Sequence, residues 1–201
     1  MRKVLTLLGD FYHDHDKFLE VVKYALKDKE IELLDSSIDN FHEYLVKKPD
    51  LLILGRENKI NPQEDNVLVW MSEDIEKDLV EYVKNGGKLI VWHSGLASYN
   101  VDGPYVSLIR GYFKHHPEPK LVTYYGNNIE FSFIDEHYFV HCDEKNTNVF
   151  LRSRSEYGDS IAGWTHNFGK GRVICLTPAH DIGLKDKKFR DYFKSLIENM
   201  I

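Results

Sequence analysis

The sequence predicts an α/β domain with a mainly parallel sheet and an antiparallel β extension in its second half. Short apolar runs alternate with helical patterns through the first half, the order that gives parallel strands with right-handed crossovers. From residue 121 onward, β-like runs follow one another with few helices between them. The 201 residues and 42% hydrophobic content indicate a single domain over residues 1–201 that can bury a sizeable core.

Local patterns define the elements of the first half. Ser72 is a helix cap followed by acidic residues that suit the helix dipole, and Gly86-Gly87 suits the end of that helix. Pro49 ends the helix before it, because the residue ahead of a proline disfavours helical geometry. The predicted order is strand 3–8, helix 16–27, strand 31–34, helix 38–46, strand 50–54, the helix after Ser72, and strand 88–92.

The second half is predicted to hold hairpins and one return to the parallel sheet. The β-like runs cover residues 121–125, 129–133, 149–154 and 160–166, then a parallel strand covers 172–177 and a helix covers 189–197. Gly169-Lys170-Gly171 lacks the spacing of a phosphate loop and is interpreted as a hairpin turn. Gly9-Asp10 shows no glycine-rich dinucleotide pattern, so no nucleotide cofactor is expected.

Composition disfavours several classes of protein. A net charge of -6 argues against nucleic-acid binding, which selects basic surfaces. We expect no membrane span, because no apolar run approaches the length that a bilayer requires, and no signal peptide, because Arg2-Lys3 leads directly into a short strand. Cys142 and Cys175 form no CxxC motif and are interpreted as buried thiols, which predicts a cytoplasmic protein.

Histidines follow three of the predicted parallel strands. His93 follows strand 88–92, His180 follows strand 172–177, and His13 or His15 follows strand 3–8. Ligands of open parallel sheets bind beyond the carboxyl ends of the strands, so these histidines are expected to share a crevice. Neutral imidazole suits a divalent metal such as zinc, or proton transfer near neutral pH. His13, His93 and His180 are the candidate metal ligands, with Glu136 or Glu156 added; the alternative is that some are packing or surface histidines.

Several segments in matching order resemble the ThuA-like (trehalose utilisation) family. They are the His13-Asp14-His15 region, Gly86 to Ser94, Arg110 to Pro117, Asp135 to Tyr138, and Gly163 to Val173 with Thr177 to His180. The resemblance covers most of the chain. It implies a flavodoxin-like, class I glutamine amidotransferase-like three-layer sandwich and a small sugar or keto-sugar as ligand.

The resemblance to amidotransferases does not extend to their nucleophile. Those enzymes place a cysteine in a turn after a sheet strand, where this chain has His93-Ser94-Gly95. A cysteine-dependent glutamine amidotransferase is therefore not expected. Ser94 instead becomes a candidate substrate-binding residue.

The remaining candidates each have a structural alternative. One carboxylate of Asp135-Glu136 could act as a general base with Tyr138 or His137 as partner, or the segment could form a plain acidic turn. Arg110 could bind a sugar oxygen, or pair with a surface acid. His116 could bind a hydroxyl or donate a proton, or lie in a solvated loop. Trp164 could stack on a sugar ring, or belong to the core.

Two functions remain open on these residues. The first is an enzyme, an isomerase, lyase or hydrolase, in which His93 and His180 transfer protons or hold a metal that polarises a sugar carbonyl. The second is a non-catalytic sugar-binding or regulatory module that kept the crevice of an amidotransferase-like fold. The strands of the second half could also offer an edge for a homodimer.

Overall fold

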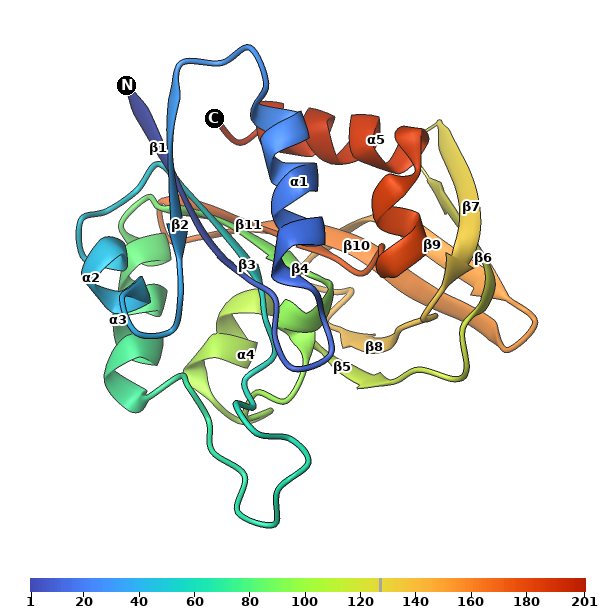
Figure 1. Ribbon diagram of the computed structural model, residues 1–201, viewed down its shortest axis with the longest axis horizontal. Helices are drawn as coiled ribbons and strands as arrows, with labels where there is room; N and C mark the ends of the chain where they lie inside the picture. Colours follow the sequence, from blue (N-terminus) through green and yellow to red (C-terminus); the bar gives the residue numbers. More distant parts are fainter. Residues whose placement is uncertain (127) are drawn as a thin grey trace.

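The computed structural model describes residues 1–126 and 128–201, which form a nine-stranded sheet and a separate two-stranded sheet (Figure 1). The strands are β1 (Arg2–Leu8), β2 (Ile31–Ser36), β3 (Leu51–Gly55), β4 (Lys88–Trp92), β5 (Gly111–His115), β6 (Lys120–Gly126), β7 (Ile129–Asp135), β8 (Phe139–Cys142), β9 (Asn148–Ser155), β10 (Gly158–Phe168) and β11 (Gly171–Leu176). The helices are α1 (His15–Leu26), α2 (Phe41–Leu45), α3 (Glu73–Lys84), α4 (Pro104–Ile109) and α5 (Lys187–Glu198), with short 3-10 turns η1 (His93–Leu96) and η2 (Asp181–Lys185).

The large sheet joins a parallel half to an antiparallel half, as the sequence predicts. Its order is β2-β1-β3-β4-β11-β10-β9-β6-β7. The first five strands are parallel, and the pairs β10–β11, β9–β10, β6–β9 and β6–β7 are antiparallel. Strands β5 and β8 form the small antiparallel sheet. The carboxyl ends of β1, β3, β4 and β11 therefore meet at one edge, where the predicted site residues follow them.

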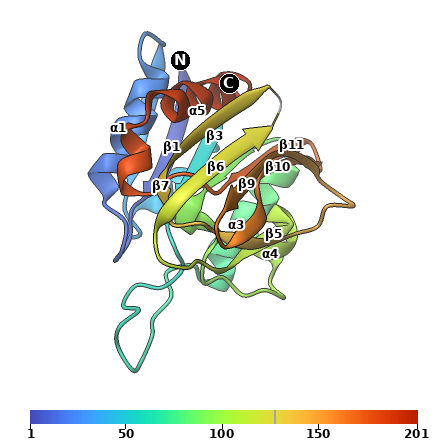
Figure 2. The ribbon, with the colours of Figure 1, turned by 90° about the vertical axis from the view of Figure 1, so that its right-hand side faces the viewer.

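Helices cover both faces of the parallel half, which gives the three layers of the predicted sandwich. Helices α1 and α5 pack on one face, and α2, α3 and α4 on the other (Figures 1 and 2). Strand β4 shows the reason in its sequence: Ile90 and Trp92 belong to the core under α1 and α5, while Leu89 and Val91 belong to the core on the opposite face. A strand buried on both faces reads as a continuous apolar run.

Capping residues set several boundaries. Asp14 accepts hydrogen bonds from the first backbone N–H groups of α1, and Ser72 accepts one from Ile75 at the start of α3. Helix α2 is shorter than the predicted 38–46. The side chain of Asn40 accepts a hydrogen bond from the Ser37 backbone N–H at 2.9 Å, and such a side-chain turn competes with helix at residues 37–40.

Three short elements were not predicted. Helix α4 has six residues, and β5 and β8 have five and four. Segments this short carry too few residues to show a period. Gly169 adopts a positive φ of 58° in the turn between β10 and β11, which confirms the hairpin interpretation.

The outer strand of the antiparallel half is β7, which lies at one end of the strand order. The predicted homodimer, which could use such an edge, stays a prediction. Over residues 1–126 and 128–201, the helices are all too short or too polar to cross a bilayer.

Candidate functional site

Three of the predicted histidines meet at the carboxyl edge of the parallel strands. His13 lies in the loop after β1, His93 begins η1 after β4, and His180 lies just beyond β11. The ring centroid of His13 lies 5.0 Å from that of His93 and 5.1 Å from that of His180, and the centroids of His93 and His180 lie 5.7 Å apart. Three imidazoles that share one tetrahedral ion would have centroids about 5.3 Å apart. The structure therefore brings these three histidines together at one edge of the sheet.

Two of these rings are oriented by hydrogen bonds that their Nδ1 atoms make to groups outside the cluster. His13 Nδ1 lies 2.5 Å from Oδ1 of the buried Asp10 carboxylate, and His93 Nδ1 lies 2.6 Å from the Thr177 carbonyl oxygen, to which it donates. The Nε2 atoms of His13 and His93 are both buried and have no hydrogen-bond partner. A histidine that donates through one nitrogen to a carboxylate or carbonyl presents the other nitrogen as a metal ligand.

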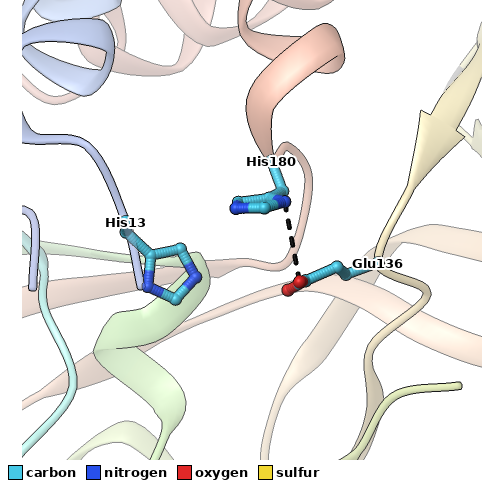
Figure 3. A group of neighbouring side chains, drawn as sticks. All are labelled: His13, Glu136 and His180. Carbon is cyan, nitrogen blue, oxygen red and sulfur yellow. Dashed lines mark ion pairs between the residues drawn. The ribbon is translucent and has the colours of Figure 1, made fainter. Parts of the chain in front are cut away.

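Glu136 lies at the centre of the histidines. Its Oε1 is 3.6 Å from His180 Nδ1, and its Oε2 is 3.7 Å from His93 Nε2 and 3.8 Å from His116 Nε2. His13, Glu136 and His180 each offer one ligand atom, and these atoms lie within 4.8 Å of one another. Figure 3 shows the three side chains converging from separate segments of the chain.

Ionisation favours a cation at this place. Burial raises the pKa of Glu136, but the facing imidazoles of His93, His180 and His116 outweigh that effect and lower the pKa to about 2. Burial lowers the pKa of His93 to about 4, so this ring is neutral near pH 7. A neutral His93 that donates through Nδ1 turns the lone pair of Nε2 toward the ionised Glu136. Both atoms are hydrogen-bond acceptors, and a proton or a metal ion between them would remove this unfavourable contact.

The pKa values of His180 and Asp10 also favour a bound cation. Burial lowers the pKa of His180, against the charge of Glu136, and so favours the neutral imidazole that binds metals. Burial raises the pKa of Asp10, but the hydrogen bond and charge of His13 outweigh it and lower the pKa to about 2. An ionised Asp10 accepts the Nδ1 proton of His13 and fixes the tautomer of that ring.

A cavity of about 310 Å³ opens beside the cluster. Its lining consists of Tyr12, His13, Glu57, Ala97, Ser98, Phe113, His116, Glu136 and Tyr138. The rings of Phe113 and Tyr138 lie 4.3 Å apart and form an apolar wall, while Tyr138 stacks on His93 at 4.1 Å. Aromatic faces next to a few convergent polar groups are typical of small-molecule sites.

Asp135 supports the cluster from the end of β7. Its Oδ1 accepts the backbone N–H of His180 at 2.7 Å, and its Oδ2 accepts the Tyr124 hydroxyl at 2.6 Å. Burial raises the pKa of Asp135 to about 8. The Asp135-Glu136 pair in the sequence was a usable signal, because alternation along β7 sends the first side chain into the core and leaves the second at the strand end.

Four candidate side chains belong neither to the histidine–carboxylate cluster nor to the lining of this cavity. Arg110 ends α4 with a φ of 56° and donates to the Asn146 carbonyl. Trp164 is fully buried and donates to the Ile109 carbonyl at 2.8 Å, as the core interpretation states. Ser94 is also fully buried. Glu156 pairs with Lys120 at 3.3 Å on the surface.

The structure also separates the neighbouring histidines. His13 is buried in the cluster, whereas His15 lies at the start of α1 and pairs with Asp16 and Asp35. His116 lines the cavity, whereas His115 is exposed at the end of β5. The two cysteines are free, and neither Cys142 nor Cys175 lines the cavity beside the histidines.

The fold and site define a flavodoxin-like α/β domain with a histidine–carboxylate pocket at the carboxyl ends of its parallel strands. The chain belongs to the ThuA family, described as trehalose utilisation, whose family model matches residues 3–196. This membership supports a carbohydrate-related role.

Solved structures share this fold. The chain resembles a ThuA-like protein from Parabacteroides merdae (TM-score 0.70, 12% identity, 94% of this chain and 86% of that one). It also resembles a cytoplasmic protein from Salmonella typhimurium LT2 (TM-score 0.67, 12% identity, 98% and 99%). Gan42B, a GH42 β-galactosidase from G. stearothermophilus, matches with a TM-score of 0.71 and 14% identity over 100% of this chain, which spans only 30% of that enzyme. A comparison with curated protein sequences finds no match.

Proposed function

We propose that this protein acts on a small sugar or keto-sugar with the help of a divalent metal ion held by His13, Glu136 and His180. The observation that carries the proposal is the convergence of these three side chains, with ligand atoms within 4.8 Å of one another, beside the aromatic cavity. Two nitrogens and a carboxylate oxygen form a ligand set that suits zinc and leaves a coordination position open.

The surroundings of the cluster divide the work among residues. A metal ion at this place would polarise a sugar carbonyl as a Lewis acid. Phe113 and Tyr138 offer a face for the ring, and the half-exposed His116 reaches both the cavity and Glu136. His116 is therefore the proton-transfer group for a carbon or hydroxyl next to the carbonyl. His93 is fully buried behind Tyr138, so it faces Glu136 rather than the ligand.

Solvent exchange tests the proposal. The zinc-loaded protein is incubated in D₂O with fructose and other ketoses, and the protons next to the carbonyl are followed by NMR. We expect deuterium incorporation that depends on the metal and is lost in His180→Ala and His116→Gln variants. The exposed His115 provides the control variant, His115→Gln, which should exchange like wild type. Sugar binding without exchange in the metal-loaded wild type would support the non-catalytic binding module instead.

We also infer a cytoplasmic location. The two cysteines are free thiols, as in a reducing compartment, and one structural neighbour is described as cytoplasmic. Detection of the native protein in a secreted fraction would contradict this inference.

A further inference from the structure

Glu57 is a second acidic residue of the cavity, distinct from the metal-binding set. It follows β3 at the start of a loop that projects from the carboxyl edge of the sheet (Figures 1 and 2). Although it lies in a loop, the residue is only 6% exposed. It lines the cavity together with Tyr138 and His116.

Hydrogen bonds from three directions fix Glu57 in place. Its backbone N–H donates to Asp10 Oδ2 at 3.1 Å, and its carbonyl accepts the indole N–H of Trp70 at 3.0 Å. The Ser98 hydroxyl donates to Oε2 of the Glu57 side chain at 2.8 Å. Because both the backbone and one carboxyl oxygen are held, the second oxygen has a defined position, as preorganised binding groups require.

That second oxygen has no partner. Glu57 Oε1 is buried and accepts no hydrogen bond from the described part of the chain. An unsatisfied buried carboxyl oxygen costs folding free energy, and such groups in native structures call for a functional explanation. A ligand in the adjoining cavity that carries a hydroxyl group would supply the missing donor.

We propose that Glu57 is a carbohydrate-binding residue that accepts a hydrogen bond from one hydroxyl group of the ligand. This inference rests on the proposed function for the class of ligand. A hydroxyl group of a sugar can donate to this oxygen, and the aromatic rings of Phe113 and Tyr138 in the same cavity suit the apolar face of a sugar ring.

Sugar binding by matched variants tests the inference. Zinc-loaded wild type, Glu57→Gln and Glu64→Gln are titrated with trehalose, glucose and the monodeoxyglucoses at millimolar concentrations. Glu64 lies in the same projecting loop but is exposed, so it is the control. We expect Glu57→Gln to weaken glucose or trehalose binding by roughly 10- to 100-fold, the effect of a hydrogen bond to a charged group. One monodeoxyglucose should bind wild type poorly, and the loss caused by its missing hydroxyl should be smaller in Glu57→Gln, whose neutral amide oxygen makes a weaker hydrogen bond.

Metal binding separates this inference from the proposed metal site. Equal zinc affinity in wild type and Glu57→Gln shows that the variant is folded and that Glu57 acts on the sugar. Unchanged sugar affinity and unchanged discrimination in Glu57→Gln would overturn the inference, as would zinc binding by a wild type that binds none of the sugars. Sugar binding that depends on Glu57 in a protein without affinity for zinc would refute the metal site and leave the assignment of Glu57 in place.

Discussion

Replacing Asp10 by asparagine should weaken the preference of His13 for a proton on Nδ1. Both carboxyl oxygens of Asp10 accept N–H groups, Oδ1 from His13 and the Tyr12 backbone, and Oδ2 from the Glu57 backbone. An asparagine of the same shape has a single acceptor oxygen, so either the Tyr12 or the Glu57 backbone N–H loses its partner. In both orientations the negative charge that favours the Nδ1 proton of His13 is lost. Part of the His13 population should then carry its proton on Nε2, the nitrogen that faces the cluster.

The magnitude follows from the burial of this pair. The side chain of Asp10 is fully buried, and its pKa of about 2 lies below the ordinary value of 3.8. The difference corresponds to an interaction of about 2 kcal/mol that favours the ionised carboxylate in the folded protein. Outer-shell partners of metal-binding histidines typically contribute about 10- to 100-fold to metal affinity. We expect Asp10→Asn to weaken zinc binding within that range.

Two measurements check the prediction. Two-bond ¹H–¹⁵N correlation spectra of metal-free protein report the protonated nitrogen of His13, and the form protonated on Nε2 should gain population in Asp10→Asn. Competition with a chromophoric chelator gives the zinc affinity. Asp16, whose side chain is 92% exposed next to His15, provides the control variant Asp16→Asn with unchanged affinity. A His13 tautomer and zinc affinity like those of wild type in Asp10→Asn would refute the reasoning.

Three further predictions concern the histidines, the fold and the cysteines. Burial holds the pKa of His93 at about 4 instead of 6.5, so His93 takes up a proton when the protein unfolds between pH 6.5 and pH 4. The free energy of unfolding should therefore fall by about 3 kcal/mol as pH is lowered through this range. Urea titrations at several pH values should show that the free energy of unfolding of His93→Gln lacks this pH dependence, whereas the control His115→Gln keeps it. The same pH dependence in both variants would contradict the prediction. A Cβ on Gly95 would lie 2.3 Å from the Leu54 carbonyl oxygen, so Gly95→Ala should lower the free energy of unfolding by about 1–3 kcal/mol; a loss within error of zero would show that η1 can shift. Burial raises the pKa of Cys142 to about 11, so iodoacetamide should label it far more slowly than glutathione, and rapid labelling seen by intact mass would refute this.

The parallel half of the fold was predictable because its signals are local and repeated. The continuous apolar runs of β3 and β4, the Ser72 cap and the Gly86-Gly87 stop each have one physical reading. The antiparallel strands were found for the same reason, with boundaries that differ from the observed ones by at most two residues. Helix α4 and strands β5 and β8 were not found, because tertiary contacts rather than a sequence period define such short segments.

The site was predictable only where the fold determines it. His13, His93 and His180 follow parallel strands, so topology alone brings them to one edge. The chemistry of Arg110 and Trp164 suggested a ligand equally well, but their position depends on packing that no motif encodes. Glu57 and Asp10 were missed for the opposite reason. An acid next to a strand end in a polar loop is common, and only the three-dimensional contacts show that both are buried.

Zinc binding tests the central claim most directly. Protein purified without an affinity tag or chelator is analysed for metal and then titrated with zinc, beside His13→Ala, His180→Ala and Glu136→Gln variants and the exposed control His115→Ala. We predict one metal ion per chain in wild type and in the control, with affinity reduced by at least about 100-fold in each cluster variant, because a directly coordinating group exceeds the contribution of an outer partner. Absence of stoichiometric binding by wild type, or wild-type affinity in the cluster variants, would contradict the account.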